Sequence, residues 1–287
     1  MSMRLASQCV RLPGAGVYAT DTTYRYDKGD PILAALRRLG RRDRAPTTAP
    51  GERIYAIGDV HGCVAQLDEL YRMILDHEAS RAPARRTHIL FLGDIVDRGP
   101  DTRGALEWID RLRRERPGVS SLFGNHEEML LRACDRDALS LGGWLSNGGD
   151  EAVASFGLDP FDGDDIGGFI ERLRVAVSSE WIDWMRSWPV TATSGDYYFC
   201  HAGVRPGVAL RRQQRRDLLW IRDEFLNDPR DHGAIIVHGH TVAPRVEMPG
   251  NRIGVDTGAY RTGVLSAVCL DGAMVDVLAT TGPTRSG

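Results

Sequence analysis

The heptapeptide Gly93-Asp94-Ile95-Val96-Asp97-Arg98-Gly99 decides the fold class, because a strand is predicted directly before it and a helix soon after it. Residues 88–92 form a short apolar run typical of a buried strand. After the heptapeptide, Ala105, Ile109 and Leu112 recur at the spacing of one helical face. The two glycines therefore bound a polar turn between a strand and a helix.

The same alternation extends outward in both directions. A strand is predicted at residues 53–57, and apolar residues at helical spacing follow from Val64 to Ile74. Another strand is predicted at 119–123, with a helix beginning near Glu127, and we expect the carboxylates of Glu127 and Glu128 to favour the dipole of that helix. Alternating strands and helices predict a parallel α/β layer in this half of the chain.

The second half of the chain is predicted to be richer in strands. They are expected at residues 197–200, 234–237, 253–255, 264–270 and 274–278. Asp271-Gly272, between the last two, indicates a tight hairpin. A helical insert is expected between the halves, at about 128–189. It contains Gly142-Gly143-Trp144, Asn147-Gly148-Gly149 and further tryptophans, including Trp188, which we expect to lie mostly in the core.

Composition excludes several classes of protein. The chain has 287 residues, is 42% hydrophobic and 26% charged, and has a formal net charge of −3, so bulk electrostatics favours neither a nucleic-acid nor a membrane partner. Its five cysteines form no CxxC pair, which argues against a zinc knuckle or a disulfide framework. No run approaches the ~20 apolar residues of a membrane span, and no secretory signal is apparent. The expected location is the cytoplasm.

The domain organisation follows from changes in composition along the chain. Residues 1–50 are expected to be an N-terminal extension and linker, with one short helix at 31–39. Residues 51–280 should form the catalytic domain, including the insert, and residues 281–287 a C-terminal tail.

Five short polar motifs lie where predicted strands end. They are GDVHG (58–62), GDIVDRG (93–99), GNHE (124–127), HAG (201–203) and GHT (239–241). In open α/β sheets, ligands bind beyond the carboxyl ends of the strands. Aspartate, asparagine and histidine together favour manganese, iron or zinc over calcium. We therefore expect two divalent metal ions, with manganese preferred and iron or zinc as alternatives, that act in hydrolysis.

The ordered motifs resemble the phosphoprotein phosphatase (PPP) family of the calcineurin-like metallophosphoesterases, and within it the bacterial and bacteriophage-lambda type of serine/threonine phosphatase. The resemblance covers residues 54–278. It implies an α/β sandwich of two central mixed sheets flanked by helices, with the insert as a helical cap. Val242 stands where many metallophosphoesterases have a further histidine, which argues against a nuclease or a generic phosphodiesterase.

The resemblance also implies a role for each matching residue. The implied metal ligands are Asp59 and His61 for the first ion, Asp94 as the bridge, and Asn125, His201 and His240 for the second. The implied phosphate-binding residues are Arg98, Arg222, Asn125 and Tyr260. A hydroxide that bridges the metals would attack phosphorus in line. His126 would protonate the leaving group as general acid, and Asp97 would orient it and hold it as imidazolium.

The favoured function is a phosphatase for phosphoserine and phosphothreonine, with phosphotyrosine as a further substrate, so that the partner is a phosphorylated protein or peptide. One alternative is a symmetrical dinucleoside tetraphosphate hydrolase. That related class typically has alanine at the position of Asp97 and aspartate at the position of Glu127, which disfavours it here. Another alternative is a non-catalytic metal-binding regulator, which degraded motifs would indicate; none of the motifs is degraded.

Overall fold

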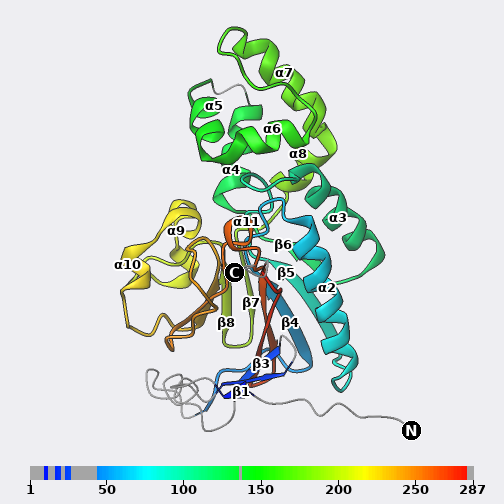
Figure 1. Cartoon of the computed structure of the whole chain (residues 1–287). Coiled ribbons are helices and arrows are strands. Elements are labelled where there is room, and N and C mark those ends of the chain that lie inside the picture. The colour runs from blue at the N-terminus through cyan, green and yellow to red at the C-terminus, as the bar shows by residue number, and fades with distance from the viewer. Residues whose placement is uncertain (1–9, 12–16, 21–22, 27–43, 136–137, 283–287) are drawn as a thin grey trace, which may run out of the picture.

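The computed structural model describes residues 10–11, 17–20, 23–26, 44–135 and 138–282, and two β-sheets lie at its centre (Figure 1). The large sheet has the order β1 (Val10–Arg11), β2 (Val17–Thr20), β3 (Thr23–Tyr26), β12 (Met274–Ala279), β11 (Ser266–Asp271), β4 (Glu52–Ile57), β5 (Arg86–Phe91) and β6 (Val119–Ser121). The small sheet has the order β10 (Arg252–Gly254), β9 (Ile235–His238), β8 (Tyr197–Cys200) and β7 (Thr191–Ser194). The expected α/β architecture with two mixed sheets is confirmed.

The parallel layer predicted for the first half is present. Strands β4, β5 and β6 pair in parallel. They alternate with α2 (Val64–Ala79), α3 (Thr102–Glu115) and α4 (Asn125–Cys134). Helix α3 begins where the side chain of Asp101 accepts a hydrogen bond from the Gly104 amide at 2.7 Å. The predicted strand and helix positions differ from the observed ones by only a few residues.

The strands of the second half complete both sheets. The hairpin predicted at Asp271-Gly272 joins β11 to β12, and Gly272 takes the left-handed φ of 59° that the turn requires. Strand β11 also pairs antiparallel with β4, which makes the large sheet mixed. Strand β7 was not predicted, because its sequence Thr-Ala-Thr-Ser has no apolar run.

The β4 strand illustrates how one element contributes to two cores. Its alternate residues face opposite sides of the sheet, as the period of a strand requires. Ile54 and Ala56 belong to the core between the two sheets. Tyr55 and Ile57 belong to the core under α2 and α3. Because both faces of the strand are covered, it is apolar along most of its length.

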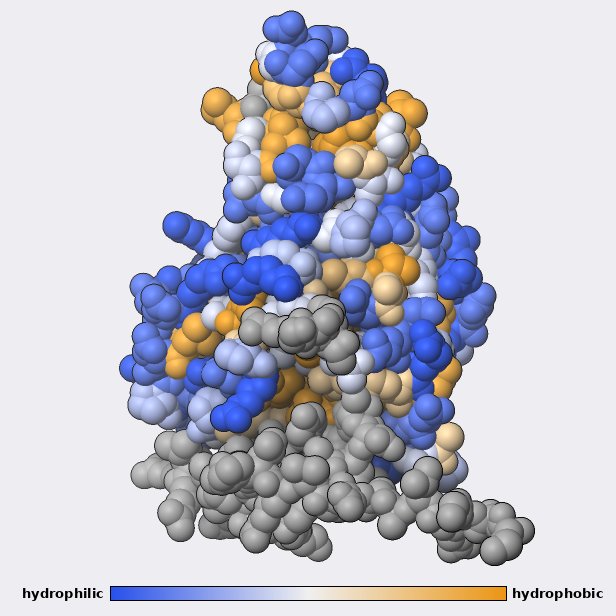
Figure 2. Space-filling view, in the orientation of Figure 1, coloured by the Kyte–Doolittle hydropathy of each residue, from blue (hydrophilic) through white to orange (hydrophobic). Residues whose placement is uncertain are grey.

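The insert is built from helices that lie at one end of the molecule, next to α4 (Figure 1). They are α5 (Ala138–Trp144), the turn η1 (Leu145–Gly149), α6 (Asp150–Ser155), α7 (Ile166–Val177) and α8 (Ser179–Arg186). Apolar patches are visible on this part of the surface in Figure 2. Two apolar side chains of the insert, Leu139 and Val175, have 94% and 80% of their surface exposed.

The N-terminal segment adds strands that were not predicted. β3 pairs antiparallel with β12, so β1 to β3 extend the large sheet beyond β12. The helix predicted at 31–39 lies outside the described residues, as does most of the predicted tail, 283–287. Among the described helices, none combines the length and apolar character that a membrane span requires.

Candidate metal centre

The five polar motifs converge at one edge of the two sheets. The first three follow β4, β5 and β6, and the last two follow β8 and β9. The side chains that they bring together are all buried: Asp59, His61, Asp94, Asp97, Asn125, His126, His201 and His240. Residues far apart in the chain therefore form one polar cluster, as the positions of the strand ends led us to expect.

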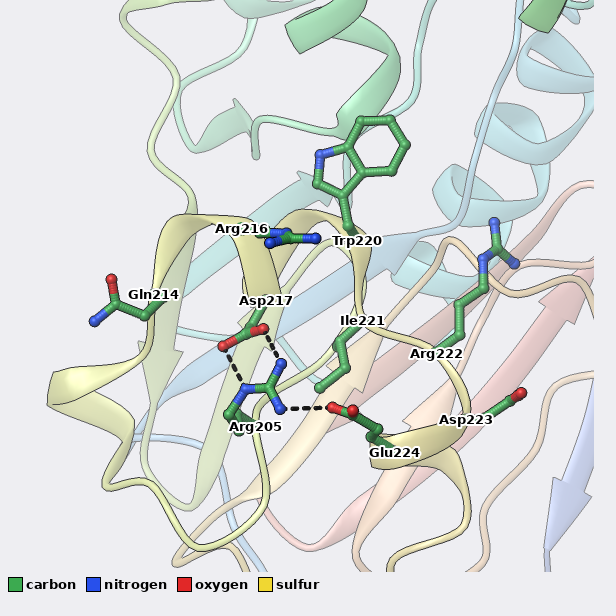
Figure 3. A pocket seen from close by; sticks show the side chains of 9 residues that line it. All are labelled: Arg205, Gln214, Arg216, Asp217, Trp220, Ile221, Arg222, Asp223 and Glu224. Carbon is green, nitrogen blue, oxygen red and sulfur yellow. Dashed lines mark hydrogen bonds and ion pairs between the residues drawn. The ribbon is translucent and has the colours of Figure 1, made fainter.

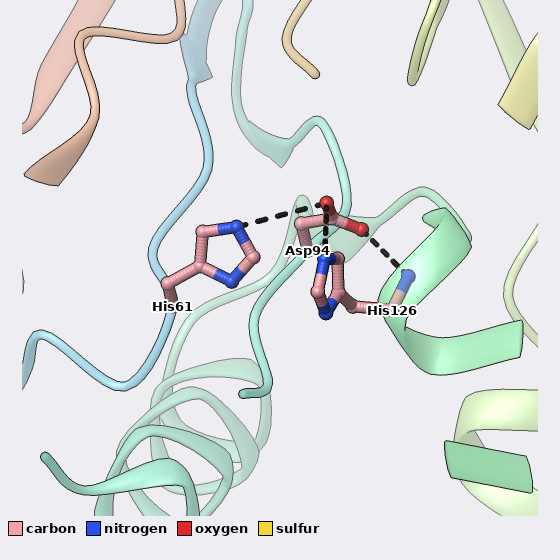
Figure 4. Close-up of side chains that lie close together, drawn as sticks. All are labelled: His61, Asp94 and His126. Atoms are coloured by element: carbon pink, nitrogen blue, oxygen red, sulfur yellow. Dashed lines mark hydrogen bonds and ion pairs between the residues drawn. The ribbon is translucent and has the colours of Figure 1, made fainter. Parts of the chain in front are cut away.

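Asp94 lies in the middle of this cluster (Figure 4). Its Oδ2 is 3.7 Å from His61 Nε2, 4.0 Å from His126 Nε2 and 3.3 Å from His201 Nε2. Two groups of possible ligand atoms share it: one with His61 and His126, the other with His201 and His240. A carboxylate common to two groups is the geometry expected of a bridging ligand.

Backbone carbonyls orient two of the histidines. His61 Nδ1 lies 2.7 Å from the Val96 carbonyl oxygen, and His201 Nδ1 lies 2.9 Å from that of Leu92. A carbonyl only accepts, so Nδ1 must carry the proton in each ring. Nε2 of both rings therefore faces Asp94 as a candidate ligand atom, a common way to orient metal-binding histidines.

The remaining predicted ligands lie around the same point. Asn125 Oδ1 is 2.8 Å from His201 Nε2, and His240 Nδ1 is 3.2 Å from the same atom. Asp59 stands beside the two groups, and both of its carboxylate oxygens accept from the His240 backbone amide at 3.1 Å. His240 Nε2 has no hydrogen-bond partner among the described residues.

The charges of the buried cluster suit divalent cations. Burial, with the neighbouring Asp256 and Asp94 carboxylates, raises the pKa of Asp59 well above its usual range. Burial lowers the pKa of His61 to about 3 and that of His240 to about 2, so both rings are neutral, the form that binds metal. Crowded carboxylates beside the neutral imidazoles of His61 and His240 in a buried site favour the binding of cations. The residues therefore fit the implied pair of metal ions.

His126 and Asp97 form the second part of the site. His126 Nδ1 is 2.8 Å from Asp97 Oδ2, and neither side chain is exposed. Burial lowers the pKa of His126 to about 4, against the opposing influence of Asp94, and burial also raises the pKa of Asp97 well above its usual range. The imidazolium implied by the resemblance therefore requires further negative charge nearby, such as that of a phosphoryl group.

The predicted phosphate-binding residues surround this centre. Arg98 donates to His61 Nε2 at 3.1 Å, and its guanidinium carbon lies 5.2 Å from the centre of the Tyr260 ring. The Tyr260 ring is also 5.3 Å from that of His61. Tyr260 belongs to α11 (Ala259–Thr262), so this short helix forms one side of the site.

Arg222 lines a pocket beside α9 (Arg215–Trp220) and α10 (Asp223–Leu226) (Figure 3). In this pocket Arg205 is held by ion pairs with Asp217 and Glu224, whereas Arg222 points away from that network. Burial is the largest cause of the lowered pKa of His126, and the positive charge of Arg222 adds to the effect. The side chain of Arg222 is exposed, and its charge acts on the buried His126 of the metal centre.

The loops carry unusual backbone conformations at these functional positions. His61, Asp94, Asp97, Arg98 and His240 have positive φ values of 46°, 52°, 70°, 65° and 64°. Such values are unfavourable for residues other than glycine and tend to cluster at active sites. The fold therefore sustains backbone strain where the predicted chemistry takes place.

Two supporting residues were not assigned a role in the site from the sequence. Glu127 lies in the first turn of α4, as expected for a carboxylate that favours the helix dipole. Its buried carboxylate also accepts from the Asp94 and Ile95 amides at 3.0 and 2.7 Å, which the sequence did not predict. Trp144, expected in the core, is indeed buried but donates from Nε1 to the Asp97 carboxylate. The position of Glu127 within the GNHE motif could have indicated a role in the site. Nothing in the sequence distinguished Trp144 from the other tryptophans of the insert.

Two curated proteins show how this chain is related to known hydrolases. A symmetrical bis(5'-nucleosyl)-tetraphosphatase of Methylococcus capsulatus is 32% identical over 153 residues, which cover 53% of this chain and 44% of the relative. The matched region therefore spans less than half the length of that relative. Serine/threonine-protein phosphatase 1 of Salmonella typhimurium is 28% identical over 221 residues, covering 74% of this chain and 89% of the relative.

A solved structure shares the fold of this chain, and a family of phosphoesterases matches most of its sequence. A solved structure of a candidate diadenosine tetraphosphatase matches 84% of this chain and 100% of its own, with a TM-score of 0.58 and 20% identity, which shows a shared fold. The calcineurin-like phosphoesterase family matches residues 52–264, a range that contains every predicted metal ligand. The chain therefore belongs to the calcineurin-like phosphoesterase family.

Proposed function

We propose that this metal-dependent phosphoester hydrolase is a phosphomonoesterase that removes phosphate from serine and threonine side chains of proteins, and also from tyrosine. The observation that carries the proposal is the buried pair of His126 and Asp97, 2.8 Å apart. An alkoxide is a poor leaving group, so an oriented proton donor accelerates its departure. Cleavage of a phosphoanhydride releases a stabilised phosphate and depends less on such a donor.

Each group of the chain has a part in this reaction. Bound divalent metal ions would supply an activated water and neutralise charge on the phosphoryl group; we propose manganese, with iron or zinc as alternatives. Arg98 and Arg222 bind phosphoryl oxygens, for which paired guanidinium donors are well matched. The negative charge of the bound phosphoryl group favours the protonated form of His126. His126 then delivers its Nε2 proton to the leaving oxygen, while Asp97 holds the ring from the other side.

A symmetrical dinucleoside tetraphosphate hydrolase is the second candidate, and the comparisons support it better. The Methylococcus capsulatus relative with that name is more identical to this chain than the Salmonella typhimurium phosphatase is, at 32% against 28%. The match to the phosphatase covers more of both chains. Asp97 is the residue that favours the phosphatase, because the tetraphosphatase class typically has alanine there.

Parallel assays of the full-length chain test the proposal. Initial rates would be measured with a phosphothreonine peptide and with diadenosine tetraphosphate, each with Mn²⁺, Mg²⁺, Fe²⁺ and Zn²⁺. We expect the peptide to be hydrolysed faster, and His126→Asn to retain metal but lose about 10²-fold or more in kcat on the peptide. Strong cleavage of diadenosine tetraphosphate alone would establish the second candidate. Unchanged peptide turnover by His126→Asn would remove the acid role.

A further inference from the structure

Trp144 connects the helical insert to the proton donor of the active site. Its indole is fully buried, and Nε1 donates to Asp97 at 2.9 Å from Oδ1 and 3.0 Å from Oδ2. Asp97 Oδ2 also lies 2.8 Å from His126 Nδ1. The Asp97 carboxylate thus links the indole of Trp144 to the imidazole of His126, and its Oδ2 contacts both rings.

The turn that follows Trp144 fixes the same loop through its backbone. The Gly148 carbonyl accepts from the Arg98 amide at 2.8 Å. Gly149 packs so closely on the indole that an added Cβ would lie 2.5 Å from its ring. Asp97 and Arg98 have left-handed φ values of 70° and 65°, which need support from surrounding structure. The insert therefore contacts both residues of this strained pair.

Burial alone does not explain the hydrogen bonds of Trp144. Trp188, at the end of the insert, is also buried, with 6% of its surface exposed. Its Nε1 has no hydrogen-bond partner among the described residues. A buried indole in this region is thus accommodated without a partner, whereas the indole of Trp144 is directed at one catalytic carboxylate. An indole N–H can only donate, and both oxygens of the Asp97 carboxyl group lie within hydrogen-bond distance of it.

We propose that Trp144 is a positioning residue for proton donation, which rests on the proposed role of His126 as general acid. Its bifurcated hydrogen bond sets the plane of the Asp97 carboxylate. The oxygen that faces His126 is then placed to hold the imidazole with Nε2 toward Asp94 and the leaving group. The insert, expected to act as a cap, thereby becomes part of the catalytic apparatus.

Replacing the indole N–H tests this role directly. Trp144→Phe removes the donor and retains an aromatic ring, and Trp188→Phe is the matched control for the same change at a buried site. Each variant would be assayed with p-nitrophenyl phosphate, which has a good leaving group, and with a phosphoserine peptide. We expect Trp144→Phe to lower kcat on the peptide about tenfold or more, with a smaller loss on p-nitrophenyl phosphate. KM and bound metal should not change, and Trp188→Phe should behave as wild type.

Two further variants separate positioning from packing. In an Asp97→Asn background, Trp144→Phe should cause little additional loss, because residues that act as one unit are not additive. If Trp144→Phe folds poorly, 3-benzothienylalanine at position 144 replaces only the N–H with sulfur and should give the same dependence on the leaving group.

The results of these assays separate the positioning role of Trp144 from the general-acid role of His126, on which it rests. Equal losses on both substrates, or full additivity with Asp97→Asn, would show that Trp144 only packs. Wild-type peptide turnover by Trp144→Phe together with strong loss by His126→Asn would overturn the role of Trp144 alone. Wild-type peptide turnover by His126→Asn would overturn both.

Discussion

At the scale of single residues, Glu127 determines the shape of the loop that carries Asp94. Its Oε1 accepts from the Ile95 amide at 2.7 Å, and its Oε2 from the Asp94 and Gly124 amides at 3.0 and 2.9 Å. Burial raises the pKa of Glu127 to about 7, while these backbone hydrogen bonds oppose the shift. One side chain thus connects the start of α4 to the loop after β5.

Replacing Glu127 by glutamine should therefore be costly. The amide –NH₂ of glutamine would face backbone N–H groups, which are also donors, and leave at least one of them without an acceptor. We expect Glu127→Gln to lower the free energy of unfolding by about 1–3 kcal/mol and to weaken metal binding. Urea denaturation and metal titration would measure the two effects.

Glu128 provides the control for that change. It is the next residue in α4 but is partly exposed, and it bonds to Trp220 Nε1 at 2.9 Å on the outside of the helix. Glu128→Gln should change stability by less than about 1 kcal/mol, as expected for a partly exposed polar contact. Equal effects of the two substitutions would contradict the role given to Glu127.

At the scale of elements, the turn η1 links the cap to catalysis. Gly148 has a φ of 98°, and a Cβ added there would lie 2.6 Å from Arg98 Cγ and 2.8 Å from its backbone nitrogen. Only glycine combines this conformation with such a close approach. The glycine at position 148 is thus explained by its close contact with Arg98.

Gly148→Ala should therefore impair catalysis as well as folding. The new methyl group would displace Arg98, so we expect a higher KM and a lower kcat, with a stability loss of about 1–2 kcal/mol from the strained backbone. Steady-state kinetics and thermal unfolding would check both. Gly142→Ala is the control in the preceding helix α5.

The control is expected to behave in the opposite way. Apart from the backbone of its own helix, no described atom lies within 4 Å of a Cβ added at Gly142. Alanine favours helix over glycine by about 1 kcal/mol, so Gly142→Ala should stabilise the protein slightly and leave kinetics unchanged. If Gly148→Ala has the kcat and KM of the wild type, the contact between the insert and Arg98 is not required for catalysis.

At the scale of the whole molecule, the metal centre joins the two sheets. Asp94 follows β5 of the large sheet, whereas His201 and His240 follow β8 and β9 of the small sheet. Their buried polar groups are costly to keep together without a cation. Metal binding should therefore stabilise the sandwich as a unit.

Removal of metal should lower the melting temperature. At a free Mn²⁺ concentration of 100 times Kd, binding adds about 2.7 kcal/mol to the free energy of unfolding, which corresponds to a shift of several degrees. Differential scanning calorimetry with Mn²⁺ and with a chelator would measure the shift. Asp94→Asn should abolish most of it, and an identical Tm in both conditions would argue against the proposed centre.

The sequence by itself determined the alternating strands and helices around GDIVDRG and the family resemblance. These features are local: apolar periodicity specifies an element, and glycine-bounded turns at strand ends place polar residues at one edge of a sheet. The parallel order of β4, β5 and β6 confirmed that expectation. Strands β1 to β3 and β7 were not predicted, because short polar or isolated segments show little hydrophobic periodicity.

Only the tertiary structure decided how the supporting residues meet. Trp144 and Asp97 are 47 residues apart, and the indole of a buried tryptophan looks like any other core residue in a sequence. Its hydrogen bond depends on where the insert packs against the loop after β5, which follows from long-range packing and from no local pattern. For the same reason, the sequence placed Glu127 in the first turn of α4, and only the packed structure shows that its carboxylate also accepts from the backbone of the loop that carries Asp94.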